Sequence, residues 1–184
     1  MIVWNRTIRI FHFLLIISIV SAFLTEDFEK IHEAIGFFIL FLILFRLFYG
    51  IFAKDRFAKL SEFFHSPKAI FRFFKSVLTF KEERHLGHNP LAGIVMFSIF
   101  MLLFVIIFSG SLGFAMKEED GIMALFVEAN FQIGKTLLDI HHISTNLLLA
   151  LIGLHLTGVL VSSILTKENL PKSIFFDGKK REEK

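Results

Sequence analysis

Four long apolar segments, separated by polar stretches, dominate the pattern of this chain. A helix needs about 20 mainly apolar residues to cross the hydrocarbon core of a bilayer. We predict spans at residues 7–24, 31–52, 91–116 and 140–166. The pattern predicts an all-α fold, an integral membrane four-helix bundle formed by residues 1–166. Residues 167–184 are rich in charge, and we expect a mobile cytoplasmic tail there.

Polar sequence between the second and third spans carries further signals. Ser66 and Pro67 are typical of a helix start, and residues 67–80 predict an amphipathic helix lying in the inner membrane interface. Asn89 is the expected N-cap of the third span. Three histidines here are expected to be solvated surface residues: His65, His85 and His88. Residues 124–131, ALFVEANF, predict a short half-buried helix at the outer side.

Composition agrees with a membrane protein and narrows its chemistry. Hydrophobic residues make up 54% of the 184 residues, and the mean hydropathy is +0.66. The chain has no cysteine. This excludes disulfides, iron–sulfur clusters, thiolate-ligated haem and covalently attached c-type haem within the chain, so any metal must be held by histidine or carboxylate. No nucleic-acid partner is expected.

Positive charge is concentrated on one side of the predicted membrane. Two arginines, Arg6 and Arg9, lie at the start of the first span, eight basic residues lie in 54–84, and six lie in 167–184. The segments on the other side are mainly acidic and hold only three lysines: Lys30, Lys117 and Lys135. The positive-inside rule therefore places both termini in the cytoplasm, with the spans in a bacterial inner membrane. We disfavour a cleaved signal peptide, because cleavage would discard His12.

Histidines within or beside the spans form two predicted pairs. His141 and His155 are 14 residues apart, which is nearly four helical turns and about 21 Å, so both lie on one helix face. His142 is rotated by roughly 140° from His155 and is the poorer partner. His12 is expected near the inner side and His32 near the outer side. Matching by depth pairs His12 with His155 and His32 with His141.

Two imidazoles facing each other suit haem better than zinc, which normally takes three or four protein ligands. Two stacked haems with two histidine ligands each would give an electron-transfer protein without an open iron position. The alternative, four unrelated membrane histidines in interhelical hydrogen bonds, is disfavoured by the match in depth. Candidates for pairing with haem propionates are Arg9 and Arg46 at the inner side and Lys30 at the outer side, although Arg46 could also extend to the headgroups.

Several motifs resemble the bacterial cytochrome b-561 family, which includes the cytochrome b subunit of nickel-iron hydrogenases. They are WNRTIRIFHF (4–13), IHEAIG (31–36), FRLFYG (45–50), LGHNP (86–90) and the segment from His141 to His155. The resemblance covers nearly the whole chain. It implies that His12, His32, His141 and His155 ligate two haems b. The chain departs from the family pattern with Asn5 for a commoner aspartate and His142 for a frequent glutamate.

These observations predict a membrane protein that passes electrons between the quinone pool and a periplasmic-side redox partner. A c-type cytochrome and an oxidoreductase subunit both fit as partners. One alternative is a stand-alone superoxide:quinone oxidoreductase, which the acidic outer segments make less attractive. A haem-free structural bundle is a second alternative, and it would leave four histidines in the membrane unexplained.

Overall fold

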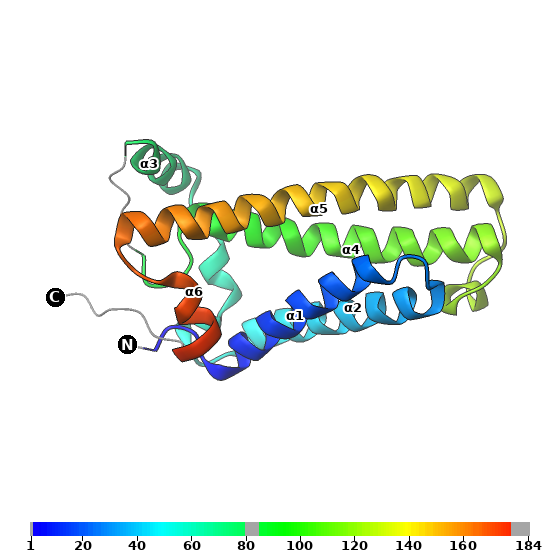
Figure 1. The fold of residues 1–184 in the computed structure, drawn as a ribbon, viewed down its shortest axis with the longest axis horizontal. Helices are drawn as coiled ribbons and strands as arrows, with labels where there is room; N and C mark the ends of the chain where they lie inside the picture. Colours follow the sequence, from blue (N-terminus) through cyan, green and yellow to red (C-terminus); the bar gives the residue numbers. More distant parts are fainter. Residues whose placement is uncertain (1, 80–84, 178–184) are drawn as a thin grey trace. The chain divides into compact units, whose positions relative to one another are not determined.

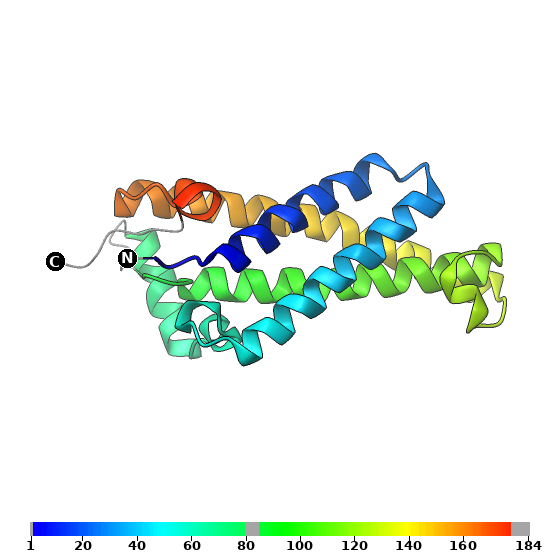
Figure 2. The ribbon, with the colours of Figure 1, turned by 90° about the horizontal axis from the view of Figure 1, so that it is seen from below.

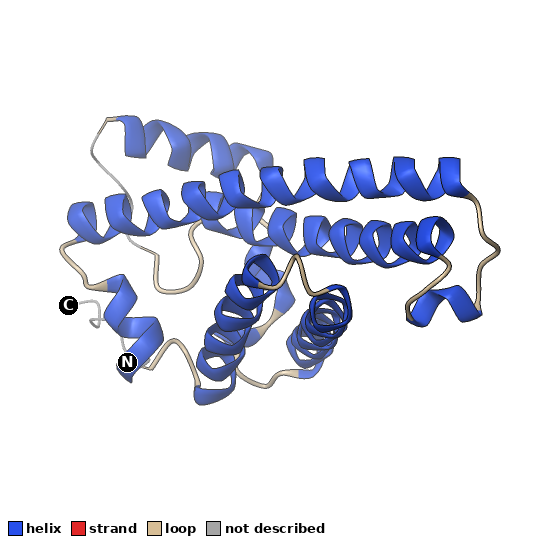
Figure 3. Ribbon diagram, turned by 45° about the vertical axis from the view of Figure 1, so that its right-hand side comes forward, coloured by secondary structure: helices blue, strands red, loops and turns tan. Residues whose placement is uncertain are grey.

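A computed structural model describes residues 2–79 and 85–177 of the chain. Helices are the regular elements of this part, which contains no strand (Figure 3). Four of the helices are long and apolar enough to cross a membrane: α1 (Arg6–Leu24), α2 (Glu29–Phe52), α4 (Pro90–Glu118) and α5 (Phe131–Thr166) (Figure 1). The predicted all-α membrane fold with four spans is therefore confirmed.

The segment between α4 and α5 differs from the prediction. The helix expected at residues 124–131 is absent, and the structure has instead a short 3₁₀ turn, η3 (Ile122–Leu125), with Leu125 83% exposed. Asn130 explains the difference, because its side-chain oxygen accepts a hydrogen bond from the Ile133 amide at 3.1 Å and so begins α5. The last span thus starts well before the predicted Ile140.

Polar caps define the elements between α2 and α4. Two 3₁₀ turns, η1 (Arg56–Ala58) and η2 (Leu60–Phe63), lead into α3 (Pro67–Leu78). Ser66 accepts a hydrogen bond from the Ala69 amide at 3.3 Å, as predicted for the N-cap of this helix. Phe73 is buried, whereas the three basic side chains of α3 are exposed: Lys68, Arg72 and Lys75. The predicted end of the helix at Phe80 lies outside the described residues.

The C-terminal segment is helical where a charged tail was expected. Helix α6 (Leu170–Lys172) and a single π-helical turn, η4 (Ser173–Asp177), follow α5. Asn169 caps this segment, since its side-chain oxygen accepts a hydrogen bond from the Lys172 amide at 2.9 Å. The structure thus adds helical structure at 170–177 to the predicted tail, and residues 178–184 of that tail lie outside the described part.

The chain forms two compact units. Unit 1 comprises the described residues of 1–14, 44–98 and 152–184, and unit 2 comprises residues 15–43 and 99–151. The boundaries between the units fall inside the four long helices, so each helix contributes one segment to each unit. Figure 2 shows each of these helices as a continuous ribbon. His12 and His155 belong to unit 1, and His32 and His141 belong to unit 2.

Glycines bring α4 and α5 into backbone contact within unit 2. A Cβ atom on Gly134 of α5 would lie 2.6 Å from the Lys117 amide nitrogen and 2.9 Å from the Gly113 carbonyl oxygen, both on α4. Glycine permits such close approach of two membrane helices. This contact fixes the spacing of the helix pair that carries His141.

Asn5 organises the start of α1 in unit 1. Its side-chain oxygen accepts a hydrogen bond from the Ile8 amide, and its side-chain nitrogen donates to Tyr49 and Asp55, each at 3.0 Å. An aspartate at position 5 would place a second carboxylate against Asp55, which like charges disfavour. The asparagine at this position is therefore matched to its neighbours.

Candidate cofactor sites

His32 of α2 and His141 of α5 face each other in unit 2. Their ring centroids are 6.0 Å apart, and the ring planes are inclined by 72°. A metal ion bonded to both rings would need two metal–nitrogen bonds of about 2 Å each. These two bonds, together with the distance from each ring centroid to its bonded nitrogen, give a centroid separation close to the one observed. The structure thus brings together the pair that matching by depth predicted.

In both histidines, Nδ1 is the ring nitrogen that bonds to a backbone carbonyl. Nδ1 of His32 donates to the Ala22 carbonyl oxygen at 2.9 Å, and Nδ1 of His141 donates to the Ile106 carbonyl oxygen at 2.8 Å. Because a carbonyl only accepts, Nδ1 carries the proton in each ring and the lone pair lies on Nε2. Metal-binding histidines commonly have this arrangement, with one nitrogen oriented by a carbonyl and the other bound to metal.

Gly110 makes the contact between α4 and His141 possible. A Cβ atom on Gly110 would lie 2.5 Å from Nδ1 and 2.8 Å from Cε1 of the His141 ring. His142, by contrast, is exposed, with its ring centroid 5.6 Å from that of His141. The structure therefore places His141, and not His142, against His32, in agreement with the helical phase of the sequence.

Glu33, next to His32, joins three elements of unit 2 and was missed by the sequence analysis. Its carboxylate accepts hydrogen bonds from the Ile122 amide at 3.0 Å and the Ser111 hydroxyl at 3.5 Å. Gly121, with φ of 88°, brings the loop to this carboxylate, and a Cβ there would lie 2.8 Å from it. The adjacent His and Glu in the sequence were the available signal.

Lys30, the outer propionate candidate, lies on the surface. Its side chain is 85% exposed, and its nitrogen is 4.0 Å from a carboxylate oxygen of Asp120. An exposed ion pair of this kind contributes little to stability. The pairing of Lys30 with a propionate therefore stays a prediction.

His12 of α1 and His155 of α5 form the second predicted pair, in unit 1. Both residues lie in this unit, and their pairing stays a prediction. Nδ1 of His12 is buried and has no hydrogen-bond partner among the described residues. Leaving a buried polar atom unsatisfied costs on the order of 1–3 kcal/mol. His12 thus has unused bonding capacity in the protein interior, which fits a residue that binds a cofactor.

The C-terminal segment covers His12. The Phe175 ring meets the His12 ring edge-on, with centroids 5.8 Å apart. Arg9, one turn before His12, donates to the carbonyl oxygens of Ile174 at 3.2 Å and Phe175 at 3.3 Å, and also to that of Phe176. Arg9 therefore holds the end of η4, a role that the sequence did not suggest.

Arg46, the other inner propionate candidate, is only 2% exposed. Its guanidinium donates to the Ala58 carbonyl oxygen at 2.9 Å and lies over the Phe63 ring, 5.3 Å from the centroid. A guanidinium has five N–H donors, so these contacts leave capacity for a further acceptor. Arg46 does not extend to the surface in the manner of a residue that reaches for headgroups.

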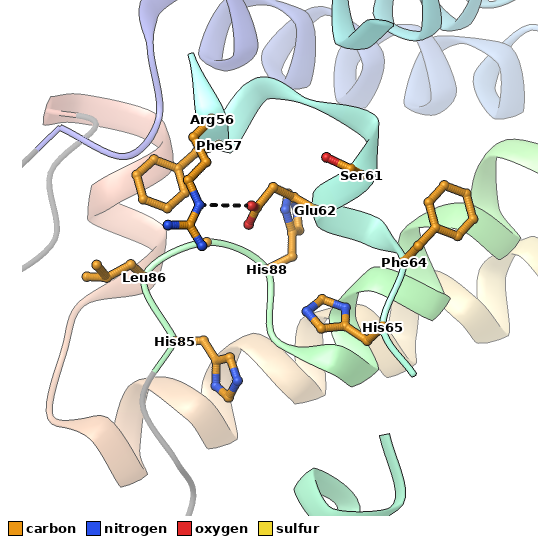
Figure 4. A pocket seen from close by; sticks show the side chains of 10 residues that line it. Arg56, Phe57, Ser61, Glu62, Phe64, His65, His85, Leu86 and His88 are labelled. Carbon is orange, nitrogen blue, oxygen red and sulfur yellow. Dashed lines mark hydrogen bonds and ion pairs between the residues drawn. The ribbon is translucent and has the colours of Figure 1, made fainter. Parts of the chain in front are cut away.

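A pocket of about 370 Å³ lies in unit 1 between residues 56–65 and residues 85–88 (Figure 4). Three histidines line it, and all are half-buried, so the prediction that they are solvated surface residues is wrong: His65, His85 and His88. Gly87 allows the two segments to approach, because a Cβ there would lie 2.8 Å from a Glu62 carboxylate oxygen.

The LGHNP motif has a structural role beside this pocket. The His88 ring packs edge-on against Trp4 and Phe63, with centroid distances of 4.9 Å and 4.8 Å. Asn89 accepts a hydrogen bond from the Ala92 amide at 2.8 Å, which confirms it as the N-cap of α4. The motif therefore starts the third span and fixes it to the beginning of the chain.

Within the described ranges, no group of three or more His, Cys, Asp or Glu side chains is arranged to hold a bare metal ion. Each histidine pair instead offers two imidazoles, the number of axial ligands that a six-coordinate haem takes from the protein. The donor sets and the spacing of the His32 and His141 rings fit haem.

Comparison with known proteins gives one family. The family model described as prokaryotic cytochrome b561 matches residues 3–177, nearly the full chain. Searches of curated proteins and of solved structures found no match.

Proposed function

The chain belongs to the prokaryotic cytochrome b561 family, and from this premise we propose that it carries two b-type haems and passes electrons between the quinone pool and a periplasmic-side redox partner. Membership of the family makes the chain a multi-pass bacterial membrane protein that binds haem b and transfers electrons. The number of haems, their ligands, the quinone and the partner belong to the proposal.

The observation that carries the proposal is the geometry of His32 and His141. Their rings are 6.0 Å apart, and each is oriented by an Nδ1–H hydrogen bond to a carbonyl. When bound, haem supplies an iron that accepts and releases one electron at a time. His32 and His141 would be its ligands, with Nε2 as the ligating atom of each, and the surrounding apolar helices would exclude water.

His12 and His155 would hold the second haem. Helix α5 then supplies one ligand to each site, α1 and α2 supply the others, and α4 supplies none. Buried Arg46 is the best propionate partner at the His12 site, because Arg9 already donates to three carbonyls of η4. Lys30 has this role at the other site in our proposal.

The distribution of charge sets the proposed orientation. Basic residues gather in the segments that we place in the cytoplasm, including both termini, in an inner membrane. The periplasmic segments are acidic, which favours a redox partner with a basic surface, either a c-type cytochrome or an oxidoreductase subunit.

An absorption spectrum and haem quantification of the purified protein test this proposal. We expect a reduced b-type spectrum and two haems per chain. His141→Ala should leave one haem, because it removes the ligand opposite His32, whereas the adjacent variant His142→Ala should keep both. Absence of a b-type spectrum would refute the proposal. If the His142 variant lost haem and the His141 variant kept both haems, the ligand assignment would be refuted.

A further inference from the structure

Helix α3 (Pro67–Leu78) has one face that is made of basic side chains, which we call the basic stripe. At about 100° per residue these side chains fall within a sector of about 60°: Lys68, Arg72 and Lys75. All three are exposed. Residues 67–78 include no aspartate or glutamate, and no carboxylate of the described residues forms an ion pair with this face. The basic stripe therefore suits a partner that carries negative charge.

A row of exposed apolar side chains, the apolar stripe, lies next to the basic stripe on α3. Phe71, Phe74 and Leu78 also fall within about 60° of one another, and they are 70%, 47% and 63% exposed. Apolar side chains that gather on a surface mark a place that an apolar phase or another molecule covers. An apolar face bordered by cations is the pattern of a helix that lies flat in a membrane interface.

Contacts within unit 1 hold α3 at the membrane end of the third span. Phe73, on the side of the helix away from both stripes, is buried, and its ring meets that of His85 edge-on with centroids 5.2 Å apart. The segment that leads into α3 lies against the first turn of α4, because a Cβ on Gly93 would be 2.5 Å from the Phe63 carbonyl oxygen. One side of the helix is therefore packed against protein at the level where a span begins, and both stripes remain exposed.

We infer that α3 lies in the headgroup region of the bilayer, where its basic stripe binds the phosphate groups of anionic phospholipids. The inference is independent of the proposed function, because it involves neither haem nor quinone. A soluble acidic protein would match the basic stripe but would leave the apolar stripe unexplained. A zwitterionic lipid would cover the apolar stripe but has no net negative charge. An anionic bilayer surface matches both stripes.

Hydrogen exchange in nanodiscs tests the lipid preference. The purified full chain is placed in nanodiscs of phosphatidylcholine, either alone or with phosphatidylglycerol as about a third of the lipid, and exchange of residues 67–78 is followed by mass spectrometry. Each Lys or Arg near an anionic surface strengthens binding by roughly fivefold. The three cations of α3 should therefore slow exchange by at least about tenfold in the anionic nanodiscs. Equal exchange in the two kinds of nanodisc would overturn the inference.

A triple variant and a matched control assign this effect to the basic stripe. The variant combines Lys68→Gln, Arg72→Gln and Lys75→Gln, and glutamine keeps a high helix propensity. We expect it to exchange at the same rate in both kinds of nanodisc. The control removes the same charge from exposed residues of unit 1 outside α3: Arg6→Gln, Lys54→Gln and Lys59→Gln. It should keep the difference between the nanodiscs. If both triple variants lost the difference equally, net charge alone would explain it and the site would be refuted.

A spin label tests the orientation of α3 without removing the basic stripe. Because the chain has no cysteine, one introduced cysteine directs the label to a single position. A label at Phe74→Cys should be more accessible to oxygen, which concentrates in the lipid, than to a water-soluble nickel complex. A label at Arg72→Cys should show the opposite preference. Greater access of the nickel complex at both positions would show that α3 faces water, which would leave a soluble acidic partner as the occupant and overturn the inference.

Discussion

A backbone carbonyl and a glycine determine the orientation of the His141 ring. The Ile106 carbonyl oxygen fixes the proton on Nδ1, and Gly110, one turn later on α4, leaves room for the ring. Both come from α4, the span that supplies no histidine. The third span therefore acts on the proposed ligand through its backbone, which explains why no motif of ligand type occurs in it.

Gly110→Ala tests this arrangement. The new Cβ would overlap the ring at 2.5 Å from Nδ1, and the ring is held by backbone on one side, so His141 must leave its position. We expect loss of about half of the bound haem, with the His12 and His155 site still occupied. Haem quantification and the reduced absorption spectrum provide the measurement.

Gly153→Ala is the matched control for this substitution. It lies in the same membrane domain, and a Cβ there meets no atom within 4 Å. Alanine favours a helix over glycine by about 1 kcal/mol, so this variant should keep its haem and be no less stable. Full haem content in the Gly110 variant would show that the ring does not need its observed position.

Among the elements, the C-terminal segment has a role that its sequence concealed. Residues 170–177 form a short helical cover whose Phe175 meets the His12 ring and whose carbonyls bind Arg9. The stretch has too few residues for a recognisable apolar period. Its position depends on a contact with α1 more than 160 residues earlier in the chain.

Arg9→Gln should release this cover. The three charge-assisted hydrogen bonds of Arg9 would be lost or weakened, and a loss of 1–2 kcal/mol raises the open population by roughly 5–30-fold. We expect trypsin to cleave after Lys172 faster by a similar factor, measured as the rate of loss of the C-terminal peptide.

Arg6→Gln serves as the control, because Arg6 is an exposed arginine in the same first turns of α1. This variant loses a cationic side chain without releasing η4, so its cleavage after Lys172 should match that of the wild type. Equal rates in both variants, with no acceleration in the Arg9 variant, would show that Arg9 does not hold the segment.

The predictable features of this chain depend on local sequence. Spans follow from apolar length, the caps at Ser66 and Asn89 follow from local hydrogen-bonding chemistry, and the choice of His141 over His142 follows from helical phase. Each of these was visible within one or a few turns. The pairing of histidines required only the order of the spans in addition.

The remaining features depend on distances between segments that are far apart in sequence. The carbonyl partners of His32 and His141 lie 10 and 35 residues away. His88 looked solvated because its own stretch is polar, yet it packs against Trp4 and Phe63. Helix spacing and loop packing set these contacts, and no single-sequence pattern reports either.

At the scale of the whole molecule, the two compact units each contain one histidine pair. Among the described residues, Ile106 and Gly110 contact His141 within unit 2, and Phe175 contacts His12 within unit 1. A ligand that binds the folded state stabilises the part of the structure that opens when it leaves. Loss of one haem should therefore weaken one unit more than the other.

Hydrogen exchange of the connecting segments tests this separation. Residues 119–130 report on unit 2, because the Ile122 amide is bound by Glu33, the neighbour of His32, and residues 53–66 report on unit 1. His141→Ala should speed exchange at 119–130 by on the order of tenfold and leave 53–66 unchanged, whereas His155→Ala should do the reverse. His142→Ala should alter neither. If either haem-site variant accelerates both segments equally, the helices that pass through both units couple them into one cooperative structure, and the two sites cannot be tuned independently.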